Sequence, residues 1–195
     1  MARLLVVRHG ETDWNRDRRL QGHVDVPLNA VGVDQAEAVA AALLEELGPR
    51  PRALLVTSDL ARARETAARI AAALGLPVRA RADLRERAYG RAEGRTWDEL
   101  RRELPAETEA HRSGRDPDAL PGVEPLVAFR ARALGAARAV AAKADAARAA
   151  AVVVTHGGVI KALLEAALGP DKRFVVGNTA LYRFDVDAAT VARVV

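Results

Sequence analysis

The sequence predicts an α/β fold, because short aliphatic runs alternate with longer segments of helical pattern along its 195 residues. Three of the aliphatic runs, at residues 4–7, 53–56 and 151–154, contain no polar residue. Runs this short and this apolar are typical of strands that are buried on both faces of a sheet. No internal repeat or linker interrupts the pattern, so we expect one domain over residues 1–195.

The first half of the chain is predicted to hold two helices and a further strand. Asn29 can cap a helix that runs to about Leu47, and apolar residues recur in it at four-residue spacing, as on one buried helix face. The Gly-Pro pair that follows can end this helix. Ser58 can cap a second helix that ends near Leu74. Residues 78–80 are expected to form a short strand.

A capping box marks the next helix. In Thr96-Trp97-Asp98-Glu99 the threonine and the glutamate have the spacing at which each satisfies the backbone amide of the other. This stretch predicts a helix that starts there and ends before Pro105. Residues 105–123 are polar and contain prolines, so we expect a loop or a small helical insert there. Residues from about 87 to 123 are together expected to form a lid or insert.

The last part of the chain is predicted to add two helices and a hairpin. Pro125 suits a first helical turn and predicts the start of a long alanine-rich helix that reaches about Ala149. Another helix is expected over residues 157–168, directly after the third aliphatic run. Residues 180–184 and 191–195 have the pattern of a closing antiparallel hairpin.

Polar residues stand at the ends of the three predicted strands. Arg8 and His9 follow the first aliphatic run, Arg62 lies shortly beyond the second, and His156 follows the third. In open α/β sheets ligands bind outside the carboxyl ends of the strands. If the three strands lie side by side and parallel, these four side chains meet in one cleft.

Four sequence blocks extend this pattern over nearly the whole chain, each at a predicted strand end. The blocks are Arg8-His9-Gly10-Glu11-Thr12 with Trp14-Asn15 and Gln21-Gly22, Ser58-Asp59-Leu60 through Glu65-Thr66, Leu84-Arg85-Glu86, and Thr155-His156-Gly157-Gly158. In this order they resemble the motifs of the histidine phosphatase superfamily, which includes the cofactor-dependent phosphoglycerate mutases. The resemblance implies a three-layer α/β/α sandwich of the phosphoglycerate mutase type. Its sheet would be mixed and mostly parallel, with helices on both faces.

His9 is expected to be the nucleophile. An imidazole attacks phosphorus only when it is neutral and has a free nitrogen lone pair. The neighbouring charges of Arg8 and Arg62 disfavour the protonated form and should keep His9 neutral near pH 7. A backbone carbonyl that binds the proton on the other ring nitrogen would fix the tautomer. The alternative is a structural histidine at a strand end.

Two arginines are expected to bind the phosphate. The guanidinium groups of Arg8 and Arg62 suit its oxygens, because they form bidentate pairs of hydrogen bonds. Arg64 competes with Arg62 for this role. The spacing Ser-Asp-Leu-x-Arg-Ala selects Arg62, and Arg64 is expected to form a surface ion pair.

His156 and Glu86 are expected to complete the catalytic set. His156 would touch the transferring phosphoryl group, either as a cation or as a hydrogen-bonding group. Gly157 opens a helix whose free amides favour an anion. Glu86 would be the general acid that protonates the leaving oxygen and then the base that activates water. Asp59 and Asp83 compete for that role, but they are expected to cap or pair structurally.

The resemblance also implies residues at the rim of the pocket. Asn15 resembles the phosphate-contacting asparagine of the family, and Gln21 and Gly22 match a loop at the pocket rim. The stretch Glu-Arg-Ala-Tyr-Gly that contains Arg87 and Tyr89 resembles the mutases, in which the arginine and the tyrosine help to hold the phosphoglycerate.

Two departures from the family bear on specificity. Many phosphatases of the superfamily carry Gly-x-Trp-Glu-Gly after the acid, whereas this chain has alanine in place of the tryptophan within residues 90–94. The Gly-Gly-Glu-Ser turn of the family appears as Gly-Val-Glu-Pro at residues 122–125. The mutases also carry a longer substrate-gripping insert, for which this chain has little room. The identity of the substrate therefore stays open.

A metal site is the rival explanation for paired histidines. His9 and His156 with Asp59 or Glu86 have the side-chain types of a zinc site. The nearby arginines repel a cation and already neutralise phosphate, and the sequence has no His-x-His or His-Glu-x-x-His spacing. We therefore expect neither a metal nor a cofactor.

Composition limits the other partners. The formal net charge is +4 and the pI is about 10.1, but the arginines are interleaved with acids and no run of five cations occurs, so nucleic acid is not expected as a partner. No apolar run approaches the ~20 residues that span a bilayer. The sequence has no cysteine, and residues 1–3 lead directly into the first strand without a signal peptide. We expect a cytoplasmic protein, with a homodimer left open.

These features together predict a phosphomonoesterase that acts on a small phosphorylated metabolite through a phosphohistidine on His9. A cofactor-dependent phosphoglycerate mutase is the alternative within the enzymes. A non-catalytic phosphate-binding protein is the alternative outside them, although a pure binder needs neither the nucleophile nor the acid.

Overall fold

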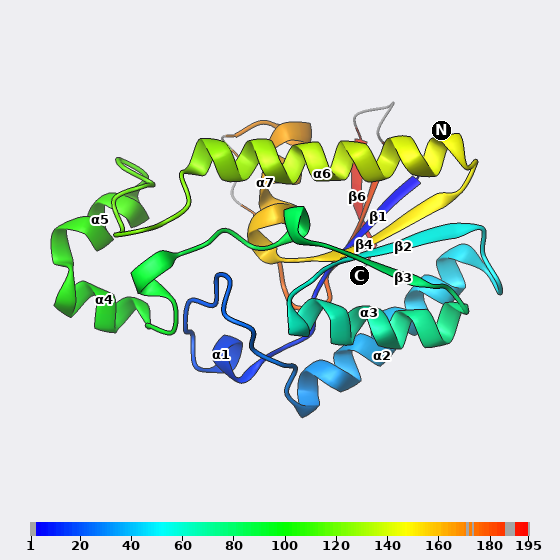
Figure 1. Ribbon diagram of the computed structural model, residues 1–195, viewed down its shortest axis with the longest axis horizontal. Coiled ribbons are helices and arrows are strands. Elements are labelled where there is room, and N and C mark those ends of the chain that lie inside the picture. Colours follow the sequence, from blue (N-terminus) through cyan, green and yellow to red (C-terminus); the bar gives the residue numbers. More distant parts are fainter. Residues whose placement is uncertain (1–2, 171, 173, 186–189, 195) are drawn as a thin grey trace.

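A six-stranded sheet runs through the middle of the molecule in the computed structural model, which describes residues 3–170, 172, 174–185 and 190–194 (Figure 1). The strands are β1 (Arg3–Arg8), β2 (Ala53–Ser58), β3 (Val78–Arg81), β4 (Ala150–Thr155), β5 (Leu181–Asp185) and β6 (Thr190–Arg193). Their order is β3-β2-β4-β1-β5-β6. The four strands from β3 to β1 are parallel, and β5 and β6 continue the sheet through antiparallel pairs. The predicted mixed, mostly parallel sheet is confirmed, as is the closing hairpin, except that Val195 lies outside the described residues.

Helices cover both faces of this sheet, which confirms the predicted three-layer α/β/α sandwich (Figure 1). The helices are α1 (Asp13–Arg16), α2 (Ala30–Leu47), α3 (Ala61–Leu74), α4 (Trp97–Glu103), α5 (Pro105–Ser113), α6 (Leu126–Ala146) and α7 (Gly157–Leu168). Two short 3₁₀ helices, η1 (Ala82–Leu84) and η2 (Gly90–Ala92), lie between β3 and α4. One hydrophobic core joins the sheet to α2 and α3, and a second joins it to α6 and α7.

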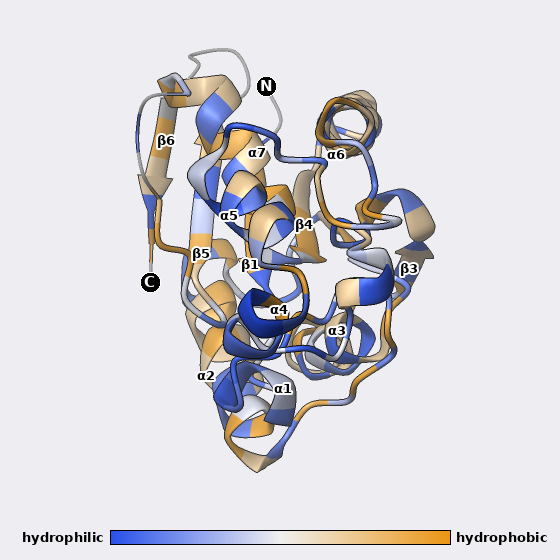
Figure 2. Cartoon of the chain, turned by 90° about the vertical axis from the view of Figure 1, so that its left-hand side faces the viewer, coloured by the Kyte–Doolittle hydropathy of each residue, from blue (hydrophilic) through white to orange (hydrophobic). Residues whose placement is uncertain are grey.

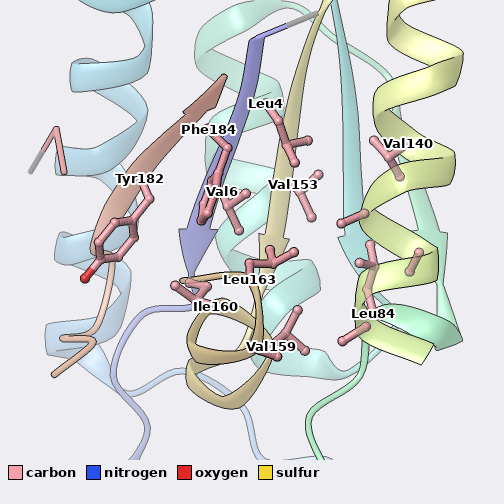
Figure 3. Packing of buried hydrophobic residues seen from close by; sticks show 14 of the residues in the cluster. Leu4, Val6, Leu84, Val140, Val153, Val159, Ile160, Leu163, Tyr182 and Phe184 are labelled. Atoms are coloured by element: carbon pink, nitrogen blue, oxygen red, sulfur yellow. The ribbon is translucent and has the colours of Figure 1, made fainter. Parts of the chain in front are cut away.

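The aliphatic run of β1 supplies both cores because successive side chains of a strand point to opposite faces. Leu4 and Val6 belong to the core beneath α6 and α7, where Val153 of β4 packs beside them (Figure 3). Leu5 and Val7 belong to the core beneath α2 and α3. Each of the four side chains is at most 3% exposed. Full burial of one such side chain is worth about 1.5–3 kcal/mol, so the unbroken run is what holds the three layers together.

Two helices begin where their capping residues predict. Asn29 caps α2 through a hydrogen bond that its Oδ1 accepts from the Gly32 amide at 2.8 Å, and the helix ends at Gly48. Thr96 and Glu99 form the reciprocal capping box at the start of α4. A cap of this kind contributes about 1 kcal/mol to helix stability.

Other boundaries differ from the prediction. Ser58 is the last residue of β2, and Leu60 takes the N-cap position of α3 without a side-chain cap, because the strand continues two residues beyond the aliphatic run. Of the two structures expected for residues 105–123, a loop or a small helical insert, the second is confirmed by helix α5. Pro125 precedes the first turn of α6 as its N-cap residue, and α6 ends at Ala146 rather than near Ala149.

The segment 87–123 builds a small structure of its own at the end of the molecule that contains α4 and α5 (Figure 1). A third, smaller hydrophobic cluster holds it together, with Ala92, Leu100 and Leu120 as its buried members. Figure 2 shows α4 as largely hydrophilic, in contrast to the hydrophobic strands β1 and β4. An isolated antiparallel bridge between Arg19 and Thr96 ties the segment to the loop that follows α1.

Candidate active site

The strand ends bring the predicted catalytic side chains together. In the parallel pair of β1 and β4, Arg8 lies opposite Thr155, and the amide of His9 donates to the carbonyl of Thr155 at 2.9 Å. The ring centroids of His9 and His156 are 5.2 Å apart. Gly10 links the same site to α3, because its amide donates to Thr66 Oγ1 at 3.0 Å.

His9 has the geometry of a neutral nucleophile. Its Nδ1 lies 2.7 Å from the carbonyl oxygen of Gly10, so this nitrogen donates its proton and Nε2 keeps a lone pair. The side chain is 3% exposed. Burial, followed by the charges of Arg62 and Arg8, holds the pKa of His9 well below its usual value of 6.5. The sequence predicts that the arginines lower this pKa and that a backbone carbonyl fixes the tautomer. The larger lowering of the pKa by burial follows only from the fold.

Arg8 and Arg62 are anchored by backbone carbonyls and remain able to bind an anion. Arg8 Nη1 donates to the carbonyl of Val176 at 2.6 Å, and the fully buried Arg62 donates to the carbonyls of Gly22 and Val24 at 2.8 and 2.9 Å. The Nε atoms of both arginines are buried and have no partner among the described residues. Burial is the main reason that the pKa of Arg62 falls to about 10, at which it is still charged at neutral pH.

His156 lies at the N-cap position of α7 and is fully buried. Its Nε2 is 2.8 Å from Ser58 Oγ, and its Nδ1 has no partner among the described residues. Burial, followed by the charge of Arg62, holds the pKa of His156 well below 6.5. Of the two roles that the sequence leaves open for His156, the environment favours the neutral hydrogen-bonding one over the cation.

Glu86 is placed by the start of α7. One carboxylate oxygen accepts from the Gly158 amide at 2.9 Å, and the other accepts from the amide of Arg87 at 2.9 Å. The two rival carboxylates are engaged elsewhere, each by two hydrogen bonds from one arginine. Asp59 binds Arg85, and Asp83 binds Arg81. These bonds lower the pKa of both rivals, which makes them poor proton donors at neutral pH.

A cavity of about 150 Å³ opens onto these groups. Its lining residues are Arg8, His9, Asn15, Arg19, Leu20, Gln21, Gly22, Arg62, Glu86 and Tyr89. Eight of these are site residues that the sequence predicts, and Arg19 and Leu20 are additions from the structure. His156 and Gly157 lie behind the lining rather than in it, the first against the ring of His9 and the second against Arg8.

The rim residues also take part in local structure. Asn15 Oδ1 accepts from the amide of Thr12 at 3.1 Å, which forms the cap of α1. Gln21 is buried, and its Oε1 has no partner among the described residues. Gly22 has a φ of +48°, a left-handed backbone that glycine adopts at low cost, and its carbonyl holds Arg62. The loop thus positions the arginine as well as lining the cavity.

Arg87 and Tyr89 have different surroundings, although the sequence assigns both to substrate binding. Tyr89 lines the cavity, and burial, followed by the charge of Glu86, raises the pKa of its hydroxyl. Arg87 is 5% exposed and lies outside the lining. Its guanidinium donates to the carbonyls of Glu124 and Pro117 and to the carboxylate of Asp118. These bonds fasten the segment 87–123 to the site and leave Arg87 fewer donors for a substrate.

Some residues around the site carry no signal in the sequence. His23 contacts the carbonyl of Glu86 through Nε2 at 2.8 Å. Arg132 of α6 binds the backbone that leads to Glu86. Arg19 lines the cavity, and its Nη1 donates to the carbonyl of Gly94 at 2.8 Å. None of the three belongs to a recognisable block, because each reaches the site through tertiary packing.

The described part of the chain contains no group of three His, Cys, Asp or Glu side chains that is arranged to hold a metal ion. The donor set of the cavity is cationic, with Arg8 and Arg62 beside two histidines of low basicity. Such a set suits an anion. Among the described helices, none has the length and apolar character needed to cross a bilayer.

Known proteins of similar sequence match most of this chain. Phosphoglycerate mutase-like protein 4 of Arabidopsis thaliana is 43% identical over 168 residues, which make up 85% of this chain and 71% of that protein. The metal-independent phosphoserine phosphatase of Arabidopsis thaliana is 37% identical over 166 residues, or 84% of this chain and 67% of that protein. The relatives therefore include proteins named as phosphatases and as mutase-like.

A solved structure extends the similarity to three dimensions. Mycobacterial glucosyl-3-phosphoglycerate phosphatase in complex with VO3 aligns with a TM-score of 0.79 and 30% identity, covering 99% of this chain and 97% of that one. The sequence profile described as the histidine phosphatase superfamily (branch 1) matches residues 4–194. The chain therefore belongs to the histidine phosphatase superfamily.

Proposed function

We propose that this protein is a phosphomonoesterase that hydrolyses a small phosphorylated metabolite through a covalent phosphohistidine on His9. The observation that carries the proposal is the bond from His9 Nδ1 to the Gly10 carbonyl in a buried site. It leaves Nε2 as a lone-pair nitrogen beside a cavity that two arginines line. Such a nitrogen can attack phosphorus without first losing a proton.

In the first step His9 Nε2 forms a bond to phosphorus, and the bond from phosphorus to the ester oxygen breaks. Arg8 and Arg62 neutralise the charge on the phosphoryl oxygens. At ~4 Å and an effective dielectric constant of ~20, each gives about 4 kcal/mol of gross attraction before the cost of desolvation. His156 can donate a hydrogen bond to the same oxygens without being a cation.

Glu86 supplies the proton balance of both steps. As a carboxylic acid it protonates the leaving alcohol oxygen in the first step. As a carboxylate it then takes a proton from water, whose oxygen attacks phosphorus and releases inorganic phosphate from His9. The amides of Arg87 and Gly158 fix the carboxyl group for both tasks.

A phosphoglycerate mutase is the second candidate, and the 43% identity to a mutase-like protein favours keeping it. A mutase must keep water away from the phosphohistidine until the substrate reorients. Here the segment 87–123 is short, and Arg87, one of the two residues expected to grip a phosphoglycerate, is bound to Asp118 and two carbonyls. Water access then favours hydrolysis.

Two assays test the proposal. His9→Ala should abolish turnover while the protein still binds inorganic phosphate, because the arginines remain in place. Substantial residual activity in that variant would exclude His9 as the nucleophile. The wild type should release inorganic phosphate without 2,3-bisphosphoglycerate and should hardly interconvert 2- and 3-phosphoglycerate. Isomerisation that outruns phosphate release on every ester tried would instead identify a mutase, and no turnover on a wide panel would favour a binding protein.

A further inference from the structure

The segment that carries Glu86 has no regular secondary structure of its own. Residues 86–89 lie between η1 and η2, outside every helix and strand. Their backbone groups must therefore find partners elsewhere, since an unpaired buried backbone group costs about as much as a lost hydrogen bond. For this stretch, here named the acid loop, the partners come from α6 and the residues just before it, and from His23 and Glu93.

Arg132 of α6 binds the start of this loop and the backbone that leads into it. Its Nη1 donates to the carbonyls of Asp83 and Arg85 at 3.1 and 2.9 Å, and its Nη2 donates to the carbonyl of Glu86 at 3.1 Å. One guanidinium thus binds the carbonyl of the acid itself and those of two residues before it. The side chain is 22% exposed, and its guanidinium carbon lies 5.3 Å from the ring centroid of Phe129. Its position is therefore fixed by packing as well as by hydrogen bonds.

Glu124 holds Arg132 in place through its carboxylate and binds the acid loop through its own backbone. Its carboxylate accepts from Arg132 Nε at 2.9 Å and from Nη2 at 2.7 Å. Its backbone amide donates to the carbonyl of Ala88 at 2.9 Å, and its own carbonyl accepts from Arg87 Nε at 2.8 Å. Burial, the largest single effect, would raise the pKa of the Glu124 carboxyl, but the hydrogen bond and the charge of Arg132, with the amide of Ala88, together hold the pKa below its usual range. The pair is therefore ionised at neutral pH.

We propose that Arg132, with Glu124 as its counter-ion, is a positioning residue that holds Glu86 where it can transfer a proton to the leaving oxygen. This inference rests on the proposed function, in which Glu86 is the general acid. The carboxyl of Glu86 is held by two amides at 2.9 Å, that of Arg87 in the acid loop and that of Gly158 in α7, so a shift of the loop relative to α7 breaks the second contact. A misplacement of about 1 Å can cost about a hundredfold in rate. Arg132 itself is not among the residues that line the cavity, and it contacts Glu86 only at the backbone carbonyl.

Substrates with different leaving groups distinguish a positioning role of Arg132 from a merely structural one. An acid matters most when the leaving oxygen is strongly basic, so its loss slows alkyl phosphates more than p-nitrophenyl phosphate. A structural defect that disturbs His9 or the arginines slows both substrates alike. The ratio of alkyl to aryl turnover therefore reports on Glu86 alone.

The test uses Arg132→Met, which keeps the unbranched stem and removes every donor. We expect kcat on an alkyl phosphate to fall about tenfold or more, with KM and the rate on p-nitrophenyl phosphate changed by less than about threefold. In a Glu86→Gln background the same change should have no further effect on the ratio, because the acid is already absent. Arg138→Met, an exposed arginine on the same helix, is the matched control and should leave the ratio unchanged.

Several outcomes would overturn the proposal. Equal losses on both substrates, or an effect of Arg132→Met that persists in full without Glu86, would make Arg132 structural. If Glu86→Gln itself slows both substrates equally, the acid assignment of the proposed function fails and the positioning role falls with it. Should Arg132→Met not fold, Glu124→Gln tests the same idea, since it keeps the shape of the pair and should lower the ratio in the same direction.

Discussion

His9 and His156 are both buried, and burial lowers the pKa of each imidazole well below 6.5. In the unfolded chain the same rings titrate near their ordinary value. Below pH 6.5 the unfolded state therefore binds protons that the folded state does not. By linkage, the free energy of unfolding falls as the pH is lowered through this range.

We expect this loss to approach about 1.4 kcal/mol per pH unit for each histidine between pH 6.5 and 5. Urea unfolding at pH 7, 6 and 5 measures it. His9→Gln removes one of the two titrating imidazoles. The slope of the free energy of unfolding against pH should therefore become shallower by up to about 1.4 kcal/mol per pH unit. An unchanged slope in the variant would mean that His9 is not responsible.

Arg62 and Arg64 provide a matched pair for the phosphate site. Arg62 is fully buried and lines the cavity, whereas Arg64 is exposed on the same helix. Arg62→Met should weaken competitive inhibition by inorganic phosphate by roughly 10- to 150-fold, the value of one hydrogen bond to a charged group of about 1.5–3 kcal/mol. Arg64→Met should leave inhibition unchanged. Arg62→Lys, which keeps the charge, guards against a folding defect, and equal inhibition constants in both methionine variants would contradict the assignment.

Several site residues can be predicted from the sequence because they stand at the ends of recognisable strands. Arg8, His9 and His156 follow aliphatic runs directly, so the sequence alone places them at one edge of the sheet. Arg132 is not predictable in this way. The carbonyls that it binds lie 46 to 49 residues earlier in the chain, and an arginine in an alanine-rich helix carries no pattern that points to them.

At the scale of the element, a capping residue predicts where a helix starts when its side chain forms a hydrogen bond to the backbone of the first turn. Asn29 and the capping box at Thr96 mark the starts of α2 and α4 for this reason. Ser58 is also a residue type that caps helices, but it is the last residue of β2, and its hydroxyl lies 2.8 Å from His156 Nε2 and 3.4 Å from the amide of Leu60. Helix α5 was left open as a loop or an insert, since its polar residues carry little apolar periodicity.

The start of α7 gives a prediction about Gly158. A Cβ at this residue would collide with the carboxylate of Glu86. Gly158→Ala should therefore displace the acid and lower kcat on alkyl phosphates by about tenfold to a hundredfold, with a smaller effect on p-nitrophenyl phosphate. Steady-state rates on both substrates measure this.

Gly135→Ala is the control for that substitution. Gly135 lies within α6, where an added Cβ would meet nothing within 4 Å. It should leave both rates unchanged and raise the free energy of unfolding by about 1 kcal/mol through helix propensity. Full activity of Gly158→Ala on alkyl phosphates would show that Glu86 tolerates displacement.

At the scale of the whole molecule, the α/β fold class can be predicted from the three aliphatic runs that alternate with helical segments. The order of the strands in the sheet cannot be predicted from them. The sequence places β1, β2 and β4 in one sheet but gives no register between them. The structure inserts β4 between β1 and β2. Tertiary packing decides this order, because the three aliphatic runs are nearly equivalent in length and apolar character.

The charge of the whole site bears on metal dependence. In the proposed mechanism, Arg8 and Arg62 supply the positive charge that phosphoryl transfer requires. We expect full phosphatase activity in excess chelator, measured as release of inorganic phosphate before and after treatment. Activity that disappears on chelation and returns with one divalent ion would reverse this expectation.

The strand order also bears on how the protein is made. Both neighbours of β1, namely β4 and β5, come from the last third of the chain. At about 5–20 residues per second, a ribosome needs on the order of ten seconds to synthesise the stretch from β1 to β4. Throughout that time the run Leu4–Val7 has no strand to pair with. The aliphatic run of β1 is thus synthesised well before both strands that pair with it, and its apolar side chains stay without their sheet partners until β4 and β5 follow.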